Sequence, residues 1–187
     1  MSVYELIKSR RTVRKFTQAP LSMDLLEKLV DAARVCPSAA NLQPLRYKIV
    51  ADKAGCDMVF KHLHWAGYLE NGTPQETERP TAYIIITQDM SARETESSYD
   101  VGAAMMAMTL CAQESGVGHC WFGSVERTAL REAFQFPENL RIVLVLALGY
   151  PAQTSVEDVV KDNNLRYWLD DEQVLHVPKH TLEDVLL

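Results

Sequence analysis

Two uninterrupted apolar runs are long enough to be strands and lack an alternating polar face. Residues 81–87 read Thr-Ala-Tyr-Ile-Ile-Ile-Thr, and residues 141–148 are apolar from Ile142 to Leu148. Strands of this composition are covered on both faces, because an exposed face would show polar residues at every second position. The two runs therefore predict a buried sheet that helices enclose.

Helical patterns surround these runs. Ser2 and Glu5 have capping-box spacing, which predicts a helix from Val3 to Ser9 or Arg10, and Ser22 begins a second helix that ends before Pro37. Further helices are expected at residues 58–68, 98–115 and 128–134, and further strands at residues 47–50 and 119–123. Strands and helices alternate without internal repeats, which predicts one α/β or α+β domain over residues 1–187.

The composition excludes several classes of protein. The 187 residues are 47% hydrophobic and 24% charged, which is typical of a globular chain and not of a disordered one. No apolar run approaches the ~20 residues that span a bilayer, and the N-terminus lacks an apolar signal core, so we expect a cytoplasmic protein. The net charge of −6 argues against a general nucleic-acid binder.

Two segments indicate contact with a second copy of the chain. Residues 98–115 are apolar almost all round, which is typical of a helix in the interior or at a subunit interface. Residues 152–177 are polar and irregular, and the short helix expected after Thr181 offers Leu182, Val185 and Leu186 as one apolar face. We expect a homodimer in which residues 152–187 form a C-terminal extension that wraps the partner subunit.

Familiar catalytic and metal-binding motifs are missing. The chain has no Gly-x-Gly-x-x-Gly, no P-loop and no Gly-x-Ser-x-Gly elbow. Its four cysteines form no Cys-x-x-Cys, and His62 and His64, which are two residues apart, do not predict a metal site. The missing motifs therefore argue against a hydrolase, a P-loop protein and a Rossmann-type enzyme.

A basic segment lies near the N-terminus. Five cations and no acid occur between Lys8 and Lys15. The segment could be a solvated helix end whose cations complement the helix dipole, or an arm that binds nucleic acid. Alternatively, Arg10, Thr12 and Arg14 project on one side of an extended segment and bind an anion such as a phosphate.

A second candidate is the loop Pro37-Ser-Ala-Ala-Asn-Leu-Gln-Pro44. It reads either as a plain turn, in which Asn41 tolerates unusual backbone angles, or as a recognition site. Amide groups both donate and accept hydrogen bonds, as an edge that alternates carbonyl and N–H groups requires. A flavin has such an edge.

Four motifs in register resemble the nitroreductase family of FMN-dependent oxidoreductases, and they extend over essentially the whole chain. The resemblance implies an α+β fold with a central, mostly antiparallel sheet flanked by helices. It also implies an intertwined homodimer with one FMN in each of two sites at the subunit interface. The motifs are Ser9-Arg-Arg-Thr-Val-Arg-Lys-Phe16, the loop of residues 37–44, Gly102-Ala-Ala with Gly116-Val-Gly-His-Cys-Trp-Phe-Gly123, and Leu148-Gly-Tyr-Pro151.

The resemblance further implies roles for individual residues. The FMN phosphate and ring edge would be held by Arg10, Arg11, Thr12 and Arg14. The other subunit would approach the flavin with Pro37, Ser38, Ala39, Asn41 and Gln43.

Backbone would run along the flavin near N5 and O4 at Cys120, Trp121, Phe122 and Gly123. Lys179 lies where many members have an arginine that closes over the phosphate, so a bidentate contact is lost here. Trp65 and Tyr68 either add aromatic surface over the flavin or belong to an ordinary amphipathic helix.

A bound flavin would carry the chemistry, so no catalytic side chain is expected. The resemblance implies an oxidoreductase in which NADH or NADPH reduces FMN at N5 and leaves before a nitroaromatic, quinone or similar electron-poor acceptor enters. Two other chemistries of the family, reductive dehalogenation and flavin fragmentation, need lids, for which residues 71–80 and 152–175 are available. A non-catalytic FMN-binding dimer is a further alternative.

Overall fold

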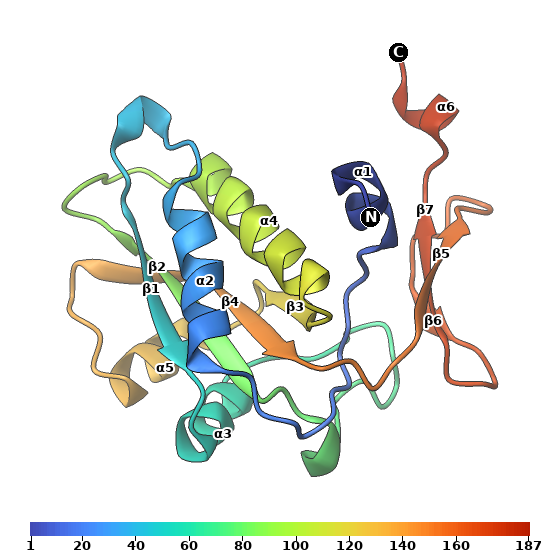
Figure 1. Ribbon diagram of the computed structural model, residues 1–187, viewed down its shortest axis with the longest axis horizontal. Coiled ribbons are helices and arrows are strands. Elements are labelled where there is room, and N and C mark those ends of the chain that lie inside the picture. Colours follow the sequence, from blue (N-terminus) through green and yellow to red (C-terminus); the bar gives the residue numbers. More distant parts are fainter.

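The computed structural model describes residues 1–187, and a four-stranded sheet lies at its centre (Figure 1). The sheet has the order β1-β2-β4-β3, and all neighbouring strands run antiparallel. This sheet and its helices confirm the predicted α+β class. The strands are β1 (Leu45–Val50), β2 (Ala82–Asp89), β3 (Gly118–Phe122) and β4 (Leu140–Gly149).

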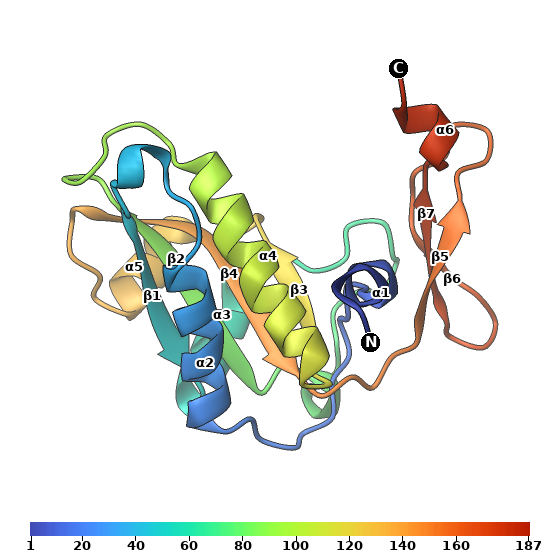
Figure 2. The ribbon, with the colours of Figure 1, turned by 45° about the horizontal axis from the view of Figure 1, so that its top comes forward.

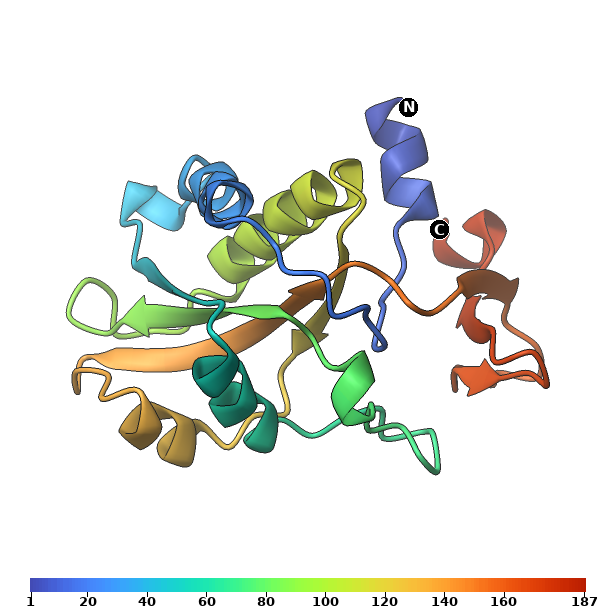
Figure 3. The same ribbon diagram turned by 60° about the horizontal axis from the view of Figure 1, so that its bottom comes forward.

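Helices cover both faces of the sheet, as the two apolar runs predict. Figure 3 shows α2 (Met23–Arg34) and α4 (Ser98–Glu114) on one face, and α3 (Lys53–Lys61) and α5 (Arg127–Ala133) on the other. Along β2, Ile84 and Ile86 pack toward the first pair of helices, whereas Tyr83 and Ile85 pack toward the second. Each fully buried aliphatic side chain contributes about 1.5–3 kcal/mol, so β2 anchors both cores.

The predicted helix starts agree with the structure. Ser2 and Glu5 form the reciprocal capping box of α1 (Val3–Ser9), and the Ser22 hydroxyl accepts the Leu25 N–H at the start of α2. Each cap satisfies a backbone donor that the first helical turn leaves unpaired.

The helix expected at residues 58–68 is wrong in its bounds. In the structure α3 begins after Asp52, whose carboxylate accepts the Gly55 N–H at 2.8 Å, and it ends at Lys61. Beyond it, Leu63 forms a bridge with Val125, and the His64 N–H donates to the Ser124 carbonyl. These backbone groups are bonded across the chain and cannot continue a helix.

The apolar helix expected at residues 98–115 is α4, which packs against α2 and the sheet. Part of its surface is uncovered. Tyr99, Gly102 and Met106 are exposed on it, and a methyl group added at Gly102 would meet nothing within 4 Å.

The polar residues after Ala152 are not irregular, as the sequence suggested. They form a second sheet of order β5-β7-β6, built from β5 (Ser155–Val159), β6 (Trp168–Leu169) and β7 (Leu175–Lys179), with β5 parallel to β7. His176 on β7 contacts Asp158 and Asp170, so polar side chains hold strands that lack apolar periodicity. We call residues 152–187 the C-terminal arm.

The arm stands beside the main body next to α1 (Figures 1 and 2). Its terminal helix α6 (Leu182–Val185) begins with a Thr181–Asp184 capping box and has no buried residue. Two short 3₁₀ helices complete the fold, η1 (Ala39–Asn41) and η2 (Glu76–Glu78). None of the helices has the length and hydropathy that crossing a membrane requires.

Candidate functional site

The basic N-terminal segment lies along β3. Thr12 forms a parallel bridge with His119, and the Val13 N–H donates to the His119 carbonyl at 2.9 Å. Farther along, Phe16 forms a bridge with Pro151 at the end of β4. The fold thereby brings two of the predicted cofactor-binding segments together, residues 10–14 and residues 120–123.

Two of the three predicted arginines have no acidic partner. The Arg10 side chain is partly buried and makes no hydrogen bond or ion pair, and burial together with neighbouring Arg11 lowers its pKa. The Arg14 guanidinium lies 4.5 Å from the centre of the Tyr167 ring, a cation–π contact. Arg11 differs, because its Nη2 lies 2.5 Å from Glu157 of β5 and its Nη1 donates to the carbonyls of Lys8 and Arg10.

A histidine that the sequence did not single out lies beneath this segment. His119 is fully buried, and neither ring nitrogen has a hydrogen-bond partner. Burial, and secondarily the Arg10 charge, lower its pKa to about 4, so the ring is neutral near pH 7. The buried, neutral imidazole adds no charge, so the unpaired Arg10 guanidinium is the group that favours an anionic ligand.

The side chains of the three predicted residues on β3 make contacts within the protein, and the fourth predicted residue, Gly123, directly follows the strand. Cys120 is buried, which raises its pKa to about 11, and Phe122 packs edge-on against Trp65 at 4.5 Å between ring centres. The Trp121 indole N–H donates to the Thr109 hydroxyl at 2.8 Å. Cys120 and Phe122 therefore offer a ligand only their backbone, whereas part of the Trp121 ring is exposed.

Arg127, which the sequence did not suggest, holds the end of this strand. Its guanidinium donates to the carbonyls of Gly123, Ile142 and Val143 at 3.0–3.1 Å. The contact with Gly123 spans only four residues, whereas the contacts with Ile142 and Val143 span 15 and 16 residues and had no local signal.

The predicted loop at residues 37–43 lies at the opposite end of the molecule, in the light-blue segment between α2 and β1 (Figure 1). It is a 3₁₀ turn in which Ala40, Asn41 and Gln43 have φ of 51°, 56° and 47°. Asn41 and Gln43 are exposed, and the Gln43 side-chain amide donates to Asn41. Within one chain, this loop does not meet the arginines of residues 10–14.

The loop backs onto a small internal cavity of about 140 Å³. The cavity walls come from the end of α2, the start of β1 and α4. The predicted residues Pro37, Ser38 and Gln43 line it together with Asp100. This volume is below the usual range for small-molecule sites.

A groove of about 530 Å³ opens beside Arg14, between two segments that the sequence marked as available lids. One wall comes from residues 68–78 and the other from the C-terminal arm, including Trp168 and Gln173. The size lies within the usual range for small-molecule sites. Tyr68 lines this groove and faces Tyr167 at 5.0 Å between ring centres, whereas Trp65 packs into the core against Phe60 and Phe122.

Lys179 lies at the end of β7 in the C-terminal arm. Its side chain is exposed and forms no ion pair, while its carbonyl accepts the Val160 N–H at 3.0 Å. It shares the small sheet with Glu157, the partner of Arg11.

Comparison with known proteins identifies the family to which this architecture belongs. The model of the "Nitroreductase family" matches residues 7–150, more than three quarters of the chain. The chain therefore belongs to the nitroreductase family, as its four motifs suggested.

Individual relatives match a similar share of the chain. A protein of Archaeoglobus fulgidus, provisionally named NADH dehydrogenase/NAD(P)H nitroreductase, is 29% identical over 156 residues, which are 79% of this chain and 84% of the relative. An iodotyrosine deiodinase of Haliscomenobacter hydrossis is 24% identical, over 80% of this chain and 79% of the relative.

Solved structures share the fold. A provisionally named nitroreductase of Desulfovibrio desulfuricans, solved in complex with FMN, has a TM-score of 0.69 at 27% identity and covers 82% of this chain and 88% of that one. A nitroreductase family protein of Clostridium novyi NT has a TM-score of 0.70 at 23% identity, and the match covers 100% of both chains.

Proposed function

We propose that this protein is an FMN-dependent NAD(P)H oxidoreductase that reduces nitroaromatic, quinone or similar electron-poor acceptors. The observation that carries the proposal is the Arg10 guanidinium, which is partly buried and unpaired beside β3. A partly buried cation without a counterion is costly, and a phosphate would supply the missing charge. The relative solved in complex with FMN supports this choice of ligand.

The residues present fit FMN. Arg10 and Thr12, with Lys179 of the arm, would hold the phosphate, and Arg14 would lie at the ring edge. The β3 backbone at residues 120–123, whose end Arg127 fixes, would run along the ring. When bound, FMN would supply the hydride chemistry, while these residues bind it, orient it and exclude water.

A homodimer completes this site. Residues 37–43 lie at the far end of the chain from Arg10, so they reach a flavin only on a second copy (Figure 1). The uncovered surface of α4 around Gly102 suits close approach of that copy, because glycine has no side chain to hold it off. Reduced cysteines and the family membership support a cytoplasmic location.

The test uses the purified chain in two steps. We expect FMN to bind with quenching of its fluorescence, in a ratio of one per chain. Without oxygen, the loaded protein should oxidise one equivalent of NADH or NADPH per FMN, and more only when an acceptor such as menadione or a nitrobenzoate is added. A chain that never retains FMN would overturn the proposal. Tight FMN binding with no oxidation of either nucleotide would instead support a non-catalytic flavin-binding dimer.

Reductive dehalogenation is a second candidate, because relatives named iodotyrosine deiodinase match four fifths of the chain. The groove beside Arg14 is lined by Tyr68, whose ring faces that of Tyr167, and an aromatic wall suits a halogenated ring. Iodide release from iodotyrosine with reduced protein, at a rate above that of nitroaromatic reduction, would favour this candidate.

A further inference from the structure

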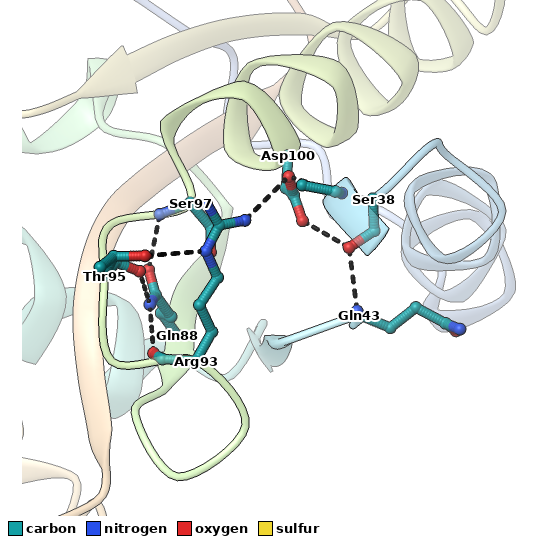
Figure 4. A network of polar contacts seen from close by, with 8 residues as sticks. Ser38, Gln43, Gln88, Arg93, Thr95, Ser97 and Asp100 are labelled. Atoms are coloured by element: carbon teal, nitrogen blue, oxygen red, sulfur yellow. Dashed lines mark hydrogen bonds and ion pairs between the residues drawn. The ribbon is translucent and has the colours of Figure 1, made fainter. Parts of the chain in front are cut away.

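A buried polar network runs from the end of β2 to the loop of residues 37–43 (Figure 4). It starts at Gln88, whose side chain is fully buried. The Gln88 amide donates to the carbonyls of Arg93 and Thr95 at 2.9 and 2.7 Å, and its oxygen accepts the Ser97 N–H at 3.0 Å. Gln88 thereby ties the segment before α4 to the sheet.

Asp100, in the first turn of α4, connects this segment to the loop. It is 4% exposed. Its carboxylate accepts the Ser38 hydroxyl at 2.5 Å and the Ala39 N–H at 3.2 Å, and lies 3.9 Å from the Arg93 guanidinium. The Ser38 oxygen in turn accepts the Gln43 N–H at 2.9 Å, so the carboxylate acts on both ends of the loop.

The loop that Asp100 holds is strained. Ala40 and Gln43 have left-handed backbone angles, which residues with a Cβ other than asparagine and aspartate avoid. Such angles persist only where surrounding contacts over-determine them, and the bonds to Asp100 and Ser38 are contacts of that kind. Arg93 in turn is held by its bond to Thr95 at 3.1 Å.

We propose that Asp100 is the positioning residue of the flavin-contacting loop. Acting through Ser38 and Ala39, it holds Asn41 and Gln43 in the geometry in which they meet the cofactor of a second copy. Gln88 and Arg93 hold Asp100 and its neighbours in turn. This inference rests on the proposed function, because FMN is the ligand that the loop is expected to contact.

The first test needs no cofactor. In the FMN-free protein, Asp100→Ala is expected to speed hydrogen exchange at the amides of Ala39 and Gln43 at least tenfold, with little change elsewhere, and Asp100→Asn to restore most of the protection. The matched control is Asp57→Asn, because Asp57 is also a hydrogen-bonded carboxylate but bonds to Lys53 on α3, on the other face of the sheet. Faster exchange throughout the chain, or none in the loop, would overturn the proposal.

The second test measures the dissociation constant for FMN. We expect Asp100→Ala and Ser38→Ala each to weaken binding about tenfold, the scale of one charge-assisted hydrogen bond. The double variant should bind no more weakly than the poorer single variant, because both changes break the same connection. Asp100→Asn should stay within about threefold of the original protein.

The results separate this inference from the proposed function. If the unaltered protein fails to bind FMN, the function is wrong, and the exchange experiment still decides whether Asp100 orders the loop. If it binds FMN but the Asp100 variants bind equally well, or the Asp100 and Ser38 effects add, the positioning role is wrong and the function stands. Should Asp100→Ala fail to fold, Ser38→Ala and Asp100→Asn carry both tests.

Discussion

At the scale of single residues, unpaired polar groups mark the site better than any motif. Arg10 has no partner, whereas Arg11 is committed to Glu157 and Arg14 to the Tyr167 ring. His119 beneath them is buried with both nitrogens free of partners. Three arginines that look alike in the sequence therefore have different environments. Arg10 is the one that has no partner within the chain, and the proposed site pairs it with the FMN phosphate.

Replacing Arg10 tests this assignment. We expect Arg10→Gln to weaken FMN binding about tenfold or more, while binding of riboflavin, which lacks the phosphate, changes little. The control is Arg34→Gln, which alters an exposed guanidinium that pairs with Asp31 on α2. Equal losses for FMN and riboflavin in a titration followed by flavin fluorescence would show that Arg10 does not bind the phosphate.

Gly149 packs closely against Phe16, the residue that directly follows the basic segment. A methyl group there would lie 2.9–3.1 Å from three atoms of the buried Phe16 side chain, which must then move. We expect Gly149→Ala to lower the free energy of unfolding by about 1–3 kcal/mol. At Gly67, where a methyl group would meet nothing within 4 Å, the same substitution should change stability little. Urea denaturation of both variants measures the difference, and equal stabilities would contradict the packing.

At the scale of elements, charged hydrogen bonds stabilise the C-terminal arm, whereas apolar packing stabilises the main body. His176 lies 2.7 Å from Asp158 and 3.1 Å from Asp170, and it stacks on Trp168 at 4.1 Å. Hydrogen bonds to Asp170 and then to Asp158 raise the pKa of His176, and the bond to His176 lowers the pKa of Asp170. One side chain thus joins all three strands of the small sheet.

The arm should respond to pH. Because the pKa of His176 is raised in the folded chain, its contribution is complete below the unfolded value of 6.5 and is lost as pH rises through the raised pKa. Asp170 acts in the opposite sense, so its contribution is lost as pH falls below 3.8. We therefore expect the arm to be most stable between these two values.

Hydrogen exchange of residues 155–179, corrected for intrinsic rates, is expected to be faster at pH 8.5 than at pH 6. His176→Gln should remove most of this pH dependence, whereas His180→Gln, which alters an exposed histidine near Asp184, should leave it intact. A pH dependence that survives in His176→Gln would show that another group controls the arm.

At the scale of the whole molecule, the two halves of the candidate site lie at opposite ends of one chain. Residues 10–14 lie against β3 beside the arm, and residues 37–43 project beyond α2 (Figure 2). A single chain therefore does not bring them together, and the proposed flavin site needs both segments from two copies.

Mixed dimers test this arrangement. In a heterodimer of one Arg10→Gln chain and one Ser38→Ala chain, a site shared between copies would carry both changes at one flavin and none at the other. We expect one FMN per heterodimer to bind as tightly as in the unaltered protein. Sites built within each chain would instead give two weakened flavins and no tight one.

A bulky side chain on the uncovered surface of α4 should prevent the proposed dimer from forming. Gly102→Arg places a long side chain on the uncovered surface of α4 and is expected to give a monomer that has lost FMN binding. The control is Thr128→Arg on α5, an exposed position on the other face of the sheet. Light scattering after size-exclusion chromatography gives the mass, and a dimeric Gly102→Arg variant with full FMN binding would contradict the proposed interface.

The sequence by itself determined the elements whose signals are local. Caps at Ser2 and Ser22, the unbroken strand expected at residues 81–87 and found as β2, and the apolar helix α4 all follow from spacings within a turn or two. The four motifs also identified the family correctly. These features depend on neighbours along the chain, so they can be predicted from it.

Only the tertiary structure decided which distant groups meet. It ended α3 through the bridge from Leu63 to Val125, ordered the arm around His176, and set Asp100 against Ser38, 62 residues away. It also buried His119 beneath Arg10 and left both without partners. Pairings of this kind depend on packing and burial across the whole fold, and no local pattern encodes them, because the loops between such residues carry no preference for where their ends will lie.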